Sequence, residues 1–379
     1  MRARLARDFE RFGRGLPPAA AAHIREAYGV DLTARYLGYT LPHPIGKGSG
    51  QLSLNQDQLE TDREAGVAFV VLKTAIAEDQ AGQRAMGAWA VHESRMRVER
   101  RRAADGRDGW TVTWKGRGWD RSFDEYLALV RCAGELTRSG ALVAVPSVKY
   151  HLPRLDEPFR EPEYRYTTDA LARAWGAGSL PIEKDFSPTL AGDPLADERS
   201  RILRWLGEVP TRIRAAAGAA PVRVALKLMN ARFDDGFQHE MMAAAGSADS
   251  LVCFNRLWDA SSGVAYGGWD LGERNLRVLR AAPRSNGPAL TGTGNVCSGR
   301  TLLDYARAGC ESVALHTYFQ LPLSEYPASV GSRTQRALHA LLFHPAEGLI
   351  AGMLDLEEAG VLHRREGELR FLDLCEGAK

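Results

Sequence analysis

A glycine-rich turn near the end of the chain has the composition of a phosphate-binding loop. The stretch 288–319, "PALTGTGNVCSGRTLLDYARAGCESVALHTYF", predicts a short strand, this turn, a helix with Ser298 at its N-cap, and a second strand. Glycines let the backbone approach a ligand closely, and the positive end of the helix dipole lies behind the turn. An anion such as a phosphate group is the expected ligand. The candidate residues are Gly292, Thr293, Gly294, Asn295, His316 and Thr317.

A dinucleotide-binding turn is the main competitor for this stretch. The third glycine, Gly299, falls two residues too late for G-x-G-x-x-G, and the next strand ends in His316–Thr317 instead of an acidic residue for a ribose. A glycine-rich turn can also serve tight packing alone. The phosphate site that a (β/α)₈ barrel builds after its last two strands is the better physical match.

Polar and charged residues also follow the other predicted strands. They are Gly48, Ser49 and Gly50 after the first strand, Lys73 after the second, Lys149 after the third, Glu183, Lys184, Asp185 and Ser187 after the fourth, Lys227 after the fifth, and Asn255 and Arg256 after the sixth. The carboxyl ends of barrel strands meet at one face, so we expect one strongly cationic site. Lys227 is flanked by apolar residues, and a buried lysine needs an anionic partner. For Lys73, extension to solvent is the alternative.

The strands that carry these residues alternate with helical patterns. Apolar strands are predicted near Pro44 and Val67 and at 141–148, 180–186, 222–229, 250–254, 289–290 and 312–315. Helices are predicted at 123–138, 199–217, 235–245, 271–281 and 300–308. Eight strands that alternate with helices predict an α/β fold, a (β/α)₈ TIM barrel, in preference to two domains.

The expected organisation has three parts. Residues 1–30 form an N-terminal helical extension, residues 31–331 the barrel, and residues 332–379 C-terminal helices and a hairpin packed on the barrel. Two segments exceed a minimal barrel and are expected at its rim: 97–120, as a hairpin, and 151–166. Long rim loops often act as lids.

Composition narrows the functional classes. Of 379 residues, 45% are hydrophobic and 25% charged, and 49 basic against 47 acidic residues leave a net charge of +2. This charge does not suggest nucleic-acid binding, and a peripheral membrane contact by the basic first helix is disfavoured against packing on the barrel. The five scattered cysteines and the absence of a signal-peptide pattern predict a cytoplasmic protein, and the histidine spacing predicts no metal site. A homodimer stays open.

Six segments resemble the dihydroorotate dehydrogenase family of FMN-dependent (β/α)₈ barrels. They are "DLTARYLGYTLPHPIGKGSG", "AGVAFVVLKTA", "VALKLMN", "LVCFNR", "AYGGWDLGERNLRVLR" and "LTGTGNVCSGRTLLDYARAGCESVALHTYF", and the likeness runs from about Asp31 to Phe319. The resemblance implies FMN as the cofactor. The implied FMN-binding residues are Gly48, Ser49, Lys73, Lys227, Asn255, Gly267, Gly268, Gly292, Thr293, Gly294, Asn295, His316 and Thr317.

The fourth strand departs from the family pattern. The family has Asn-x-Ser-Cys-Pro-Asn or Asn-x-Ser-Ser-Pro-Asn there, whereas this chain has "IEKDFSPTL". Aligned on Ser187–Pro188, Ser187 takes the place of the catalytic base, and Lys184 and Thr189 take the places of asparagines that hold the orotate ring. Arg256 likewise replaces a Ser or Thr. The implied substrate-binding residues are Lys184, Asp185, Thr189 and Arg256, and a site built for other hydrogen bonds indicates a substrate other than dihydroorotate.

The resemblance implies hydride transfer between flavin and a small anionic, pyrimidine-related or amino-acid-derived substrate. Ser187 would move the proton, and Lys73 and Lys227 would stabilise negative charge on the ring and substrate. Three alternatives stay open: a non-redox barrel isomerase or lyase with a phosphorylated substrate, a true dihydroorotate dehydrogenase, and a flavin-retaining scaffold without turnover. The electron acceptor, substrate and direction of the reaction are undetermined.

Overall fold

The structure is a computed structural model of the 379-residue chain. It describes residues 1–86, 96–102, 106, 108–114, 118–186, 199–230, 234–259, 264–266, 269–283 and 287–376.

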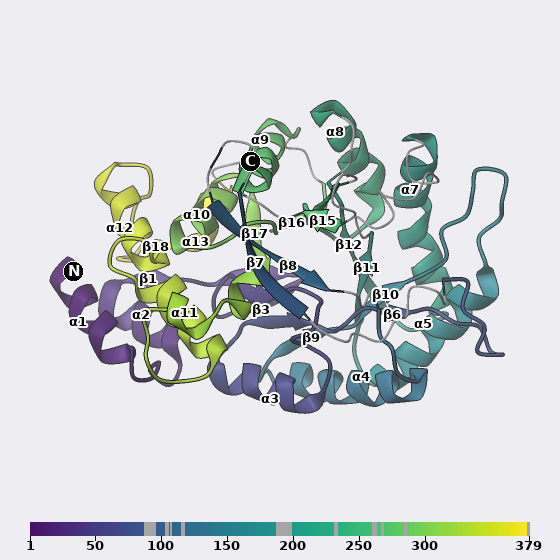
Figure 1. Ribbon diagram of the computed structural model, residues 1–379, viewed down its shortest axis with the longest axis horizontal. Helices are drawn as coiled ribbons and strands as arrows, with labels where there is room; N and C mark the ends of the chain where they lie inside the picture. The colour runs from purple at the N-terminus through teal and green to yellow at the C-terminus, as the bar shows by residue number, and fades with distance from the viewer. Residues whose placement is uncertain are drawn as a thin grey trace.

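A parallel sheet of ten short strands forms the centre of the described part of the chain (Figure 1). The strands are β4 (Ile45–Lys47), β5 (Phe69–Val71), β6 (Ala75–Ile76), β9 (Val143–Val145), β10 (Ser147–Lys149), β11 (Leu180–Asp185), β12 (Val222–Lys227), β13 (Ser250–Cys253), β16 (Ala289–Gly292) and β17 (Cys310–Leu315). Their order is β6-β10-β11-β12-β13-β16-β17-β4-β5-β9. These strands are nearly all buried, as expected for β-branched and apolar runs covered on both faces. The predicted α/β fold with a parallel sheet is confirmed.

The two strands at one end of this order, β6 and β10, directly follow in sequence the two strands at the other end, β5 and β9. Residues 72–74 separate β5 from β6, and Pro146 alone separates β9 from β10. β5 pairs with β9, and β6 pairs with β10. Pro146 has no N–H to donate, which explains the break in the ladder, but its carbonyl still accepts a hydrogen bond from the Glu183 N–H at 2.9 Å. Closure into a complete (β/α)₈ barrel stays a prediction.

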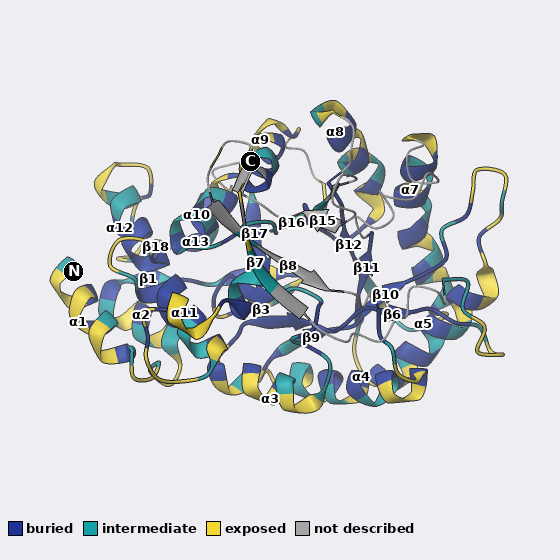
Figure 2. Ribbon diagram, viewed as in Figure 1, coloured by how far each residue is buried: buried dark blue, intermediate teal, exposed yellow. Residues whose placement is uncertain are grey.

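Helices follow most of the strands and cover the outside of the sheet, with their exposed faces turned to solvent (Figure 2). They are α3 (Gln56–Ala65), α4 (Phe123–Arg138), α5 (Glu161–Trp175), α7 (Arg199–Ala216), α8 (Asp235–Ala244), α9 (Trp269–Ala281) and α10 (Gly299–Arg307). Side-chain caps fix several starts: Asn55 caps α3, Ser122 and Glu125 form a capping box at α4, and Ser298 caps α10 as predicted. Short 3₁₀ segments are η3 (Ala245–Ser247), η4 (Thr317–Gln320) and η5 (Leu323–Glu325).

The two terminal segments pack on each other. The N-terminal part contains α1 (Arg2–Phe12), α2 (Ala20–Tyr28) and β1 (Val30–Asp31), and the C-terminal part α11 (Arg333–Phe343), α12 (Leu349–Glu358), β18 (Leu369–Arg370) and α13 (Phe371–Glu376). Phe9 stacks on His339, with ring centroids 4.5 Å apart, and β1 pairs with β18 in parallel. The apolar face of the first helix is therefore occupied by packing. No helix in the described residues combines the length and apolar composition needed to cross a bilayer.

Within "VLHRREGELRFLDL", at the end of the chain, the expected hairpin is limited to one tight turn, and a helix follows it. Arg365 and Glu368 form a single antiparallel bridge around Glu366 and Gly367, both with positive φ, and the chain then enters β18 and α13. Phe371, Leu374 and Cys375 are buried. Their spacing of three and four residues is helical, and this spacing decides the structure.

Hairpins lie beyond the strands of the sheet, both near their carboxyl ends and near their amino ends. The predicted rim hairpin is confirmed: β7 (Met96–Arg102) pairs with β8 (Asp108–Trp114), and β8 contacts η4, α9 and β15 (Val264–Tyr266), which pairs with β14 (Leu257–Asp259). The second predicted rim segment is irregular up to Arg160, after which α5 begins.

At the amino ends of the strands, β2 (Ala34–Tyr36) and β3 (Tyr39–Leu41) form another hairpin. This hairpin packs the aromatic ring of Tyr36 against the sheet, and we call the resulting contact with Phe69 the aromatic plug. The rings of Tyr36 and Phe69 stack with centroids 4.3 Å apart, and both residues are buried. A Cβ added at Gly46 would overlap the Phe69 ring. Glycine at this position therefore makes room for the plug.

We predict that Gly46→Ala lowers the free energy of unfolding by roughly 1 to 3 kcal/mol, because the added methyl group overpacks the Tyr36–Phe69 contact. Gly246→Ala is the matched control, since a Cβ there meets nothing within 4 Å and the backbone has no positive φ. Urea unfolding of the two variants measures the difference. Equal midpoints would show that Phe69 moves aside without cost.

Candidate functional site

His316 lies directly after β17, and the charges of cations from four other strand ends, including Lys47 at the end of β4, act on it. Burial and the nearby charges of Arg256, Lys73 and Lys227 hold the pKa of His316 well below its usual value. The Gln51 N–H donates to His316 Nε2 at 3.2 Å. The charges of three predicted site residues therefore reach a fourth, His316, and leave its imidazole neutral.

Two side chains that the sequence analysis did not identify, Asn275 and Tyr305, form hydrogen bonds to the backbone of the predicted phosphate turn. Asn275 Nδ2 donates to the carbonyls of Phe254 and Thr293, each at 2.9 Å. The Tyr305 hydroxyl lies 3.0 Å from the Thr293 carbonyl and 2.7 Å from that of Gly294. Asn275 is fully buried. A buried asparagine in the amphipathic pattern of "NLRVLR" is the only signal that could have drawn attention to it.

These contacts fix the backbone conformation of the turn. Gly294 has a φ of +100° and Asn295 a φ of +54°, and a Cβ at Gly294 would overlap Asn275 Nδ2. The Thr293 hydroxyl donates to the Ala314 carbonyl at 2.8 Å, which ties the turn to β17. In the described part of the chain, no protein group accepts the N–H of Gly294 or of Asn295. Two N–H groups beside the start of α10 suit an anion.

A second cluster of charge lies on neighbouring strands β10, β11 and β12. Lys149 Nζ is 3.6 Å from Asp185 Oδ2, and Lys227 Nζ is 4.0 Å from Asp185 Oδ1. Burial raises the pKa of Asp185, but the charges of Lys227 and Lys149 outweigh it and leave the pKa below its usual value. Asp185 Oδ1 is buried and accepts no hydrogen bond from the described residues. The carboxylate can therefore accept a bond from a ligand.

Lys184 lies on the opposite face of β11 from Asp185, because side chains alternate along a strand. It is fully buried, its Nζ donates to the Asp185 carbonyl at 3.0 Å and lies 4.3 Å from the centre of the Phe186 ring. Burial lowers the pKa of Lys184 to about 7. The predicted substrate contact of Lys184 stays a prediction, while the geometry places Asp185 with the other strand-end charges.

Glu183 is the neighbour of Asp185 on the same face and is completely buried. Burial raises the pKa of Glu183 to about 7, although Lys227 Nζ lies 3.9 Å from Oε1. Sequence reasoning noted this residue at the strand end without giving it a role. A glutamate within an apolar strand was the available signal.

The other predicted residues are placed as follows. The Gly48 N–H donates to the Leu315 carbonyl at 2.8 Å, and Ser49 Oγ lies 2.8 Å from Thr74 Oγ1. The Asn255 N–H donates to the Leu228 carbonyl at 2.8 Å. Gly292 ends β16, and Thr317 begins η4. Ser187, Thr189, Gly267 and Gly268 lie outside the described residues.

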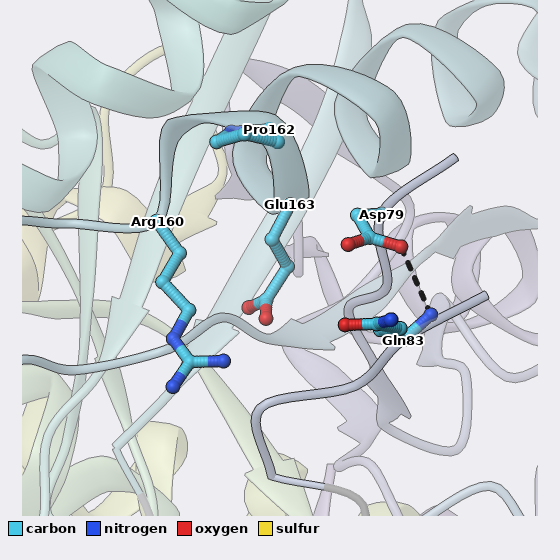
Figure 3. Close-up of a pocket in the computed structure, with 5 residues that line it drawn as sticks. All are labelled: Asp79, Gln83, Arg160, Pro162 and Glu163. Carbon is cyan, nitrogen blue, oxygen red and sulfur yellow. Dashed lines mark hydrogen bonds between the residues drawn. The ribbon is translucent and has the colours of Figure 1, made fainter. Parts of the chain in front are cut away.

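A pocket of about 160 Å³ lies between the chain after β6 and the start of α5 (Figure 3). It is lined by Asp79, Gln83, Arg160, Pro162 and Glu163. The Glu163 carboxylate already accepts hydrogen bonds from the N–H groups of His151, at 2.6 Å, and Ala85, at 3.3 Å. This carboxylate therefore serves the local fold.

Comparison of the sequence with models of known protein families gives no match, and comparison with curated proteins also gives none.

We predict that Lys184→Met changes the pH dependence of stability. The folded protein binds fewer protons at Lys184 than the unfolded chain between pH 7 and the ordinary lysine pKa of 10.5, so this group makes stability rise with pH across that window. Between pH 7.5 and 9.5 the wild type should gain roughly 2 to 3 kcal/mol relative to the variant. Guanidinium unfolding at several pH values measures this. Leu226→Met, on the same face of the next strand, is the uncharged control, and a Lys184→Met curve parallel to the wild type would refute the buried-lysine account.

Proposed function

We propose that this protein is an FMN-dependent oxidoreductase that transfers hydride between the flavin and a small anionic substrate. The observation that carries the proposal is the turn after β16, where Asn275, Tyr305 and Thr293 hold the backbone of Gly294 and Asn295 in place. The turn lies at the same strand ends as His316, on which the charges of Lys73, Lys227 and Arg256 act. This cationic group lies at the carboxyl ends of the strands, on the same side as a turn with two N–H groups open to an anion. The resemblance to dihydroorotate dehydrogenases supports the same assignment.

The proposal includes a closed barrel. If β5 continues into β6, and β9 into β10, the ten strands become eight, and each pairs with two neighbours. The order then follows the chain around a ring, with β17 beside β4. Parallel (β/α)₈ barrels place ligands at the carboxyl ends of their strands, where the charged residues are.

The residues present fit FMN at both ends of the molecule. The phosphate would accept hydrogen bonds from the N–H groups of Gly294 and Asn295, with Asn275 and Tyr305 holding the turn in position. Lys227 would face the electron-poor pyrimidine end of the ring, where negative charge develops on reduction. When bound, FMN supplies a centre that accepts or donates a hydride.

The substrate would lie against the remaining strand-end groups. Arg256 and Lys73 would attract its anionic group, and Asp185 Oδ1 would accept a hydrogen bond from an N–H or O–H of the substrate, because this buried oxygen has no donor in the described residues. Ser187 is proposed as the group that moves the substrate proton. The polar residues near Asp185 and Arg256 differ from those with which the family binds orotate, and this difference favours a substrate other than dihydroorotate.

The visible absorption spectrum of the purified protein tests the proposal. Flavin bands, with FMN released on denaturation, are the expected result. A colourless protein that FMN does not reconstitute would overturn the proposal, and binding of a phosphorylated sugar or acid in its place would indicate a non-redox isomerase or lyase.

Two substitutions locate the flavin in this site. Gly294→Ala should prevent FMN retention, because the new Cβ displaces the turn, whereas Gly178→Ala is the control with a similar positive φ, +91°, and no atom within 4 Å of the new Cβ. Lys227→Met should weaken FMN binding by roughly tenfold to a hundredfold through loss of a charged hydrogen bond. Equilibrium titration with FMN measures both effects. Unchanged affinity in both variants would place the flavin elsewhere.

A further inference from the structure

A row of hydroxyl groups runs from the first strand end into the centre of the sheet. Ser49 Oγ lies 2.8 Å from Thr74 Oγ1, and Thr74 Oγ1 lies 3.0 Å from Ser147 Oγ. Ser147 Oγ is 3.5 Å from Glu183 Oε1. Ser49 is half-buried, whereas Ser147 and Glu183 have no exposed surface. The row therefore joins the region of the candidate site to a carboxyl group that solvent does not reach.

The sheet determines the order of these groups. Thr74 lies between β5 and β6, Ser147 begins β10, and Ser147 is in register with Glu183 on β11. The Tyr126 hydroxyl, from α4, accepts a hydrogen bond from the Ser147 N–H at 3.0 Å and donates to the Ser147 carbonyl at 2.9 Å. The backbone of Ser147, the member of the row next to Glu183, is thus fixed from outside the sheet.

Each member of the row can both donate and accept a hydrogen bond. A hydroxyl group has one donor hydrogen and two acceptor lone pairs, so a proton can enter on one side while another leaves on the other. Glu183 can end such a row in either form: as a carboxylic acid it donates, and as a carboxylate it accepts.

The groups that face Glu183 come from four elements. The Tyr36 hydroxyl, from β2, donates to Oε2 at 3.4 Å, and Lys227 on β12 lies 3.9 Å from Oε1. Asp185 on β11 repels the charged form, and the buried Tyr126 on α4 is the fourth titratable neighbour. Burial is the largest influence and raises the pKa of Glu183 to about 7, with Lys227 opposing it. Both forms are therefore accessible near neutral pH.

We propose that Glu183 is an internal proton store that exchanges one proton with the ligand site through Ser147, Thr74 and Ser49. In the outward direction Glu183 gives its proton to Ser147 Oγ, each hydroxyl passes its own hydrogen to the next oxygen, and Ser49 delivers one proton to the ligand. The carboxylate that remains is stabilised by Lys227 and Tyr36. The reverse direction refills the store, and no other reactant is consumed.

This inference deepens the proposed function, on which it rests for the identity of the proton acceptor. Hydride transfer to or from a carbon acid requires that a proton also move. Ser187 is proposed to exchange that proton with the substrate, and the store replaces or removes it at the ligand site without admitting water. Glu183 acts through the hydroxyl groups and does not touch the ligand, so its effect must be separated from that of a structural residue.

Infrared difference spectroscopy of the protein as purified tests the store. We expect the carbonyl-stretching band of a protonated, buried carboxyl group that disappears with a midpoint near pH 7, and we expect Glu183→Gln to lack this band. If the wild type shows no such band, or if Glu183→Gln retains it, Glu183 is not the store.

A pH jump tests the path. Ser147→Ala removes the hydroxyl that adjoins Glu183, and we expect the Glu183 band to respond to the jump at least about tenfold more slowly than in wild type, because the proton loses a relay partner. Ser312→Ala is the matched control, since Ser312 is equally buried and its hydroxyl lies 3.0 Å from Thr291 Oγ1, in a pair separate from the row. Equal response rates in the two variants would overturn the relay. Both readouts come from the protein itself, so they stand or fall independently of FMN binding.

Discussion

Asp185 is the carboxylate on which the charge balance of the strand ends depends. Lys149 and Lys227 lie within 4.0 Å of its two oxygens, and Lys184 donates to its backbone carbonyl from the other face of the strand. Each lysine is removed from water, and a buried charge is costly unless an opposite charge or a hydrogen bond compensates it. The sheet can hold a cationic site at these ends because β11, which carries Asp185 and Glu183, lies between β10 with Lys149 and β12 with Lys227.

The cost of burying a charge also explains why the titratable groups of the site differ in protonation state. Asp185 is held below its usual pKa by the charges of Lys227, Lys149 and Lys184, whereas Glu183 is wholly buried and is opposed in charge only by Lys227 of these lysines, so its pKa rises to about 7. His316, under the charges of four cations, remains neutral. Neighbouring groups of similar chemistry thus differ in charge because burial and the signs of their neighbours differ, and the strand register determines which neighbours each one has.

Much of the fold followed from the sequence, because periodicity and capping act locally. The helix predicted at 123–138 coincides with α4, and Ser298 caps α10 as its spacing indicated. The side-chain partners could not be predicted in the same way. Asn275 and Tyr305 support the turn from helices α9 and α10, and Thr74, Ser147 and Glu183 meet only through strand pairing. Lys184 was expected to contact the substrate because it takes the place of a family asparagine, but it lies on the opposite face of β11 from Asp185, since adjacent residues of a strand face opposite ways.

A crystal structure of the protein with FMN would test the central claim most directly, because it would show which groups the two ends of the cofactor contact. The account predicts the phosphate within hydrogen-bond distance, about 3 Å, of the Gly294 and Asn295 N–H groups, and the pyrimidine end of the ring facing Lys227. A phosphate bound away from this turn, or a flavin ring turned away from Lys227, would contradict it.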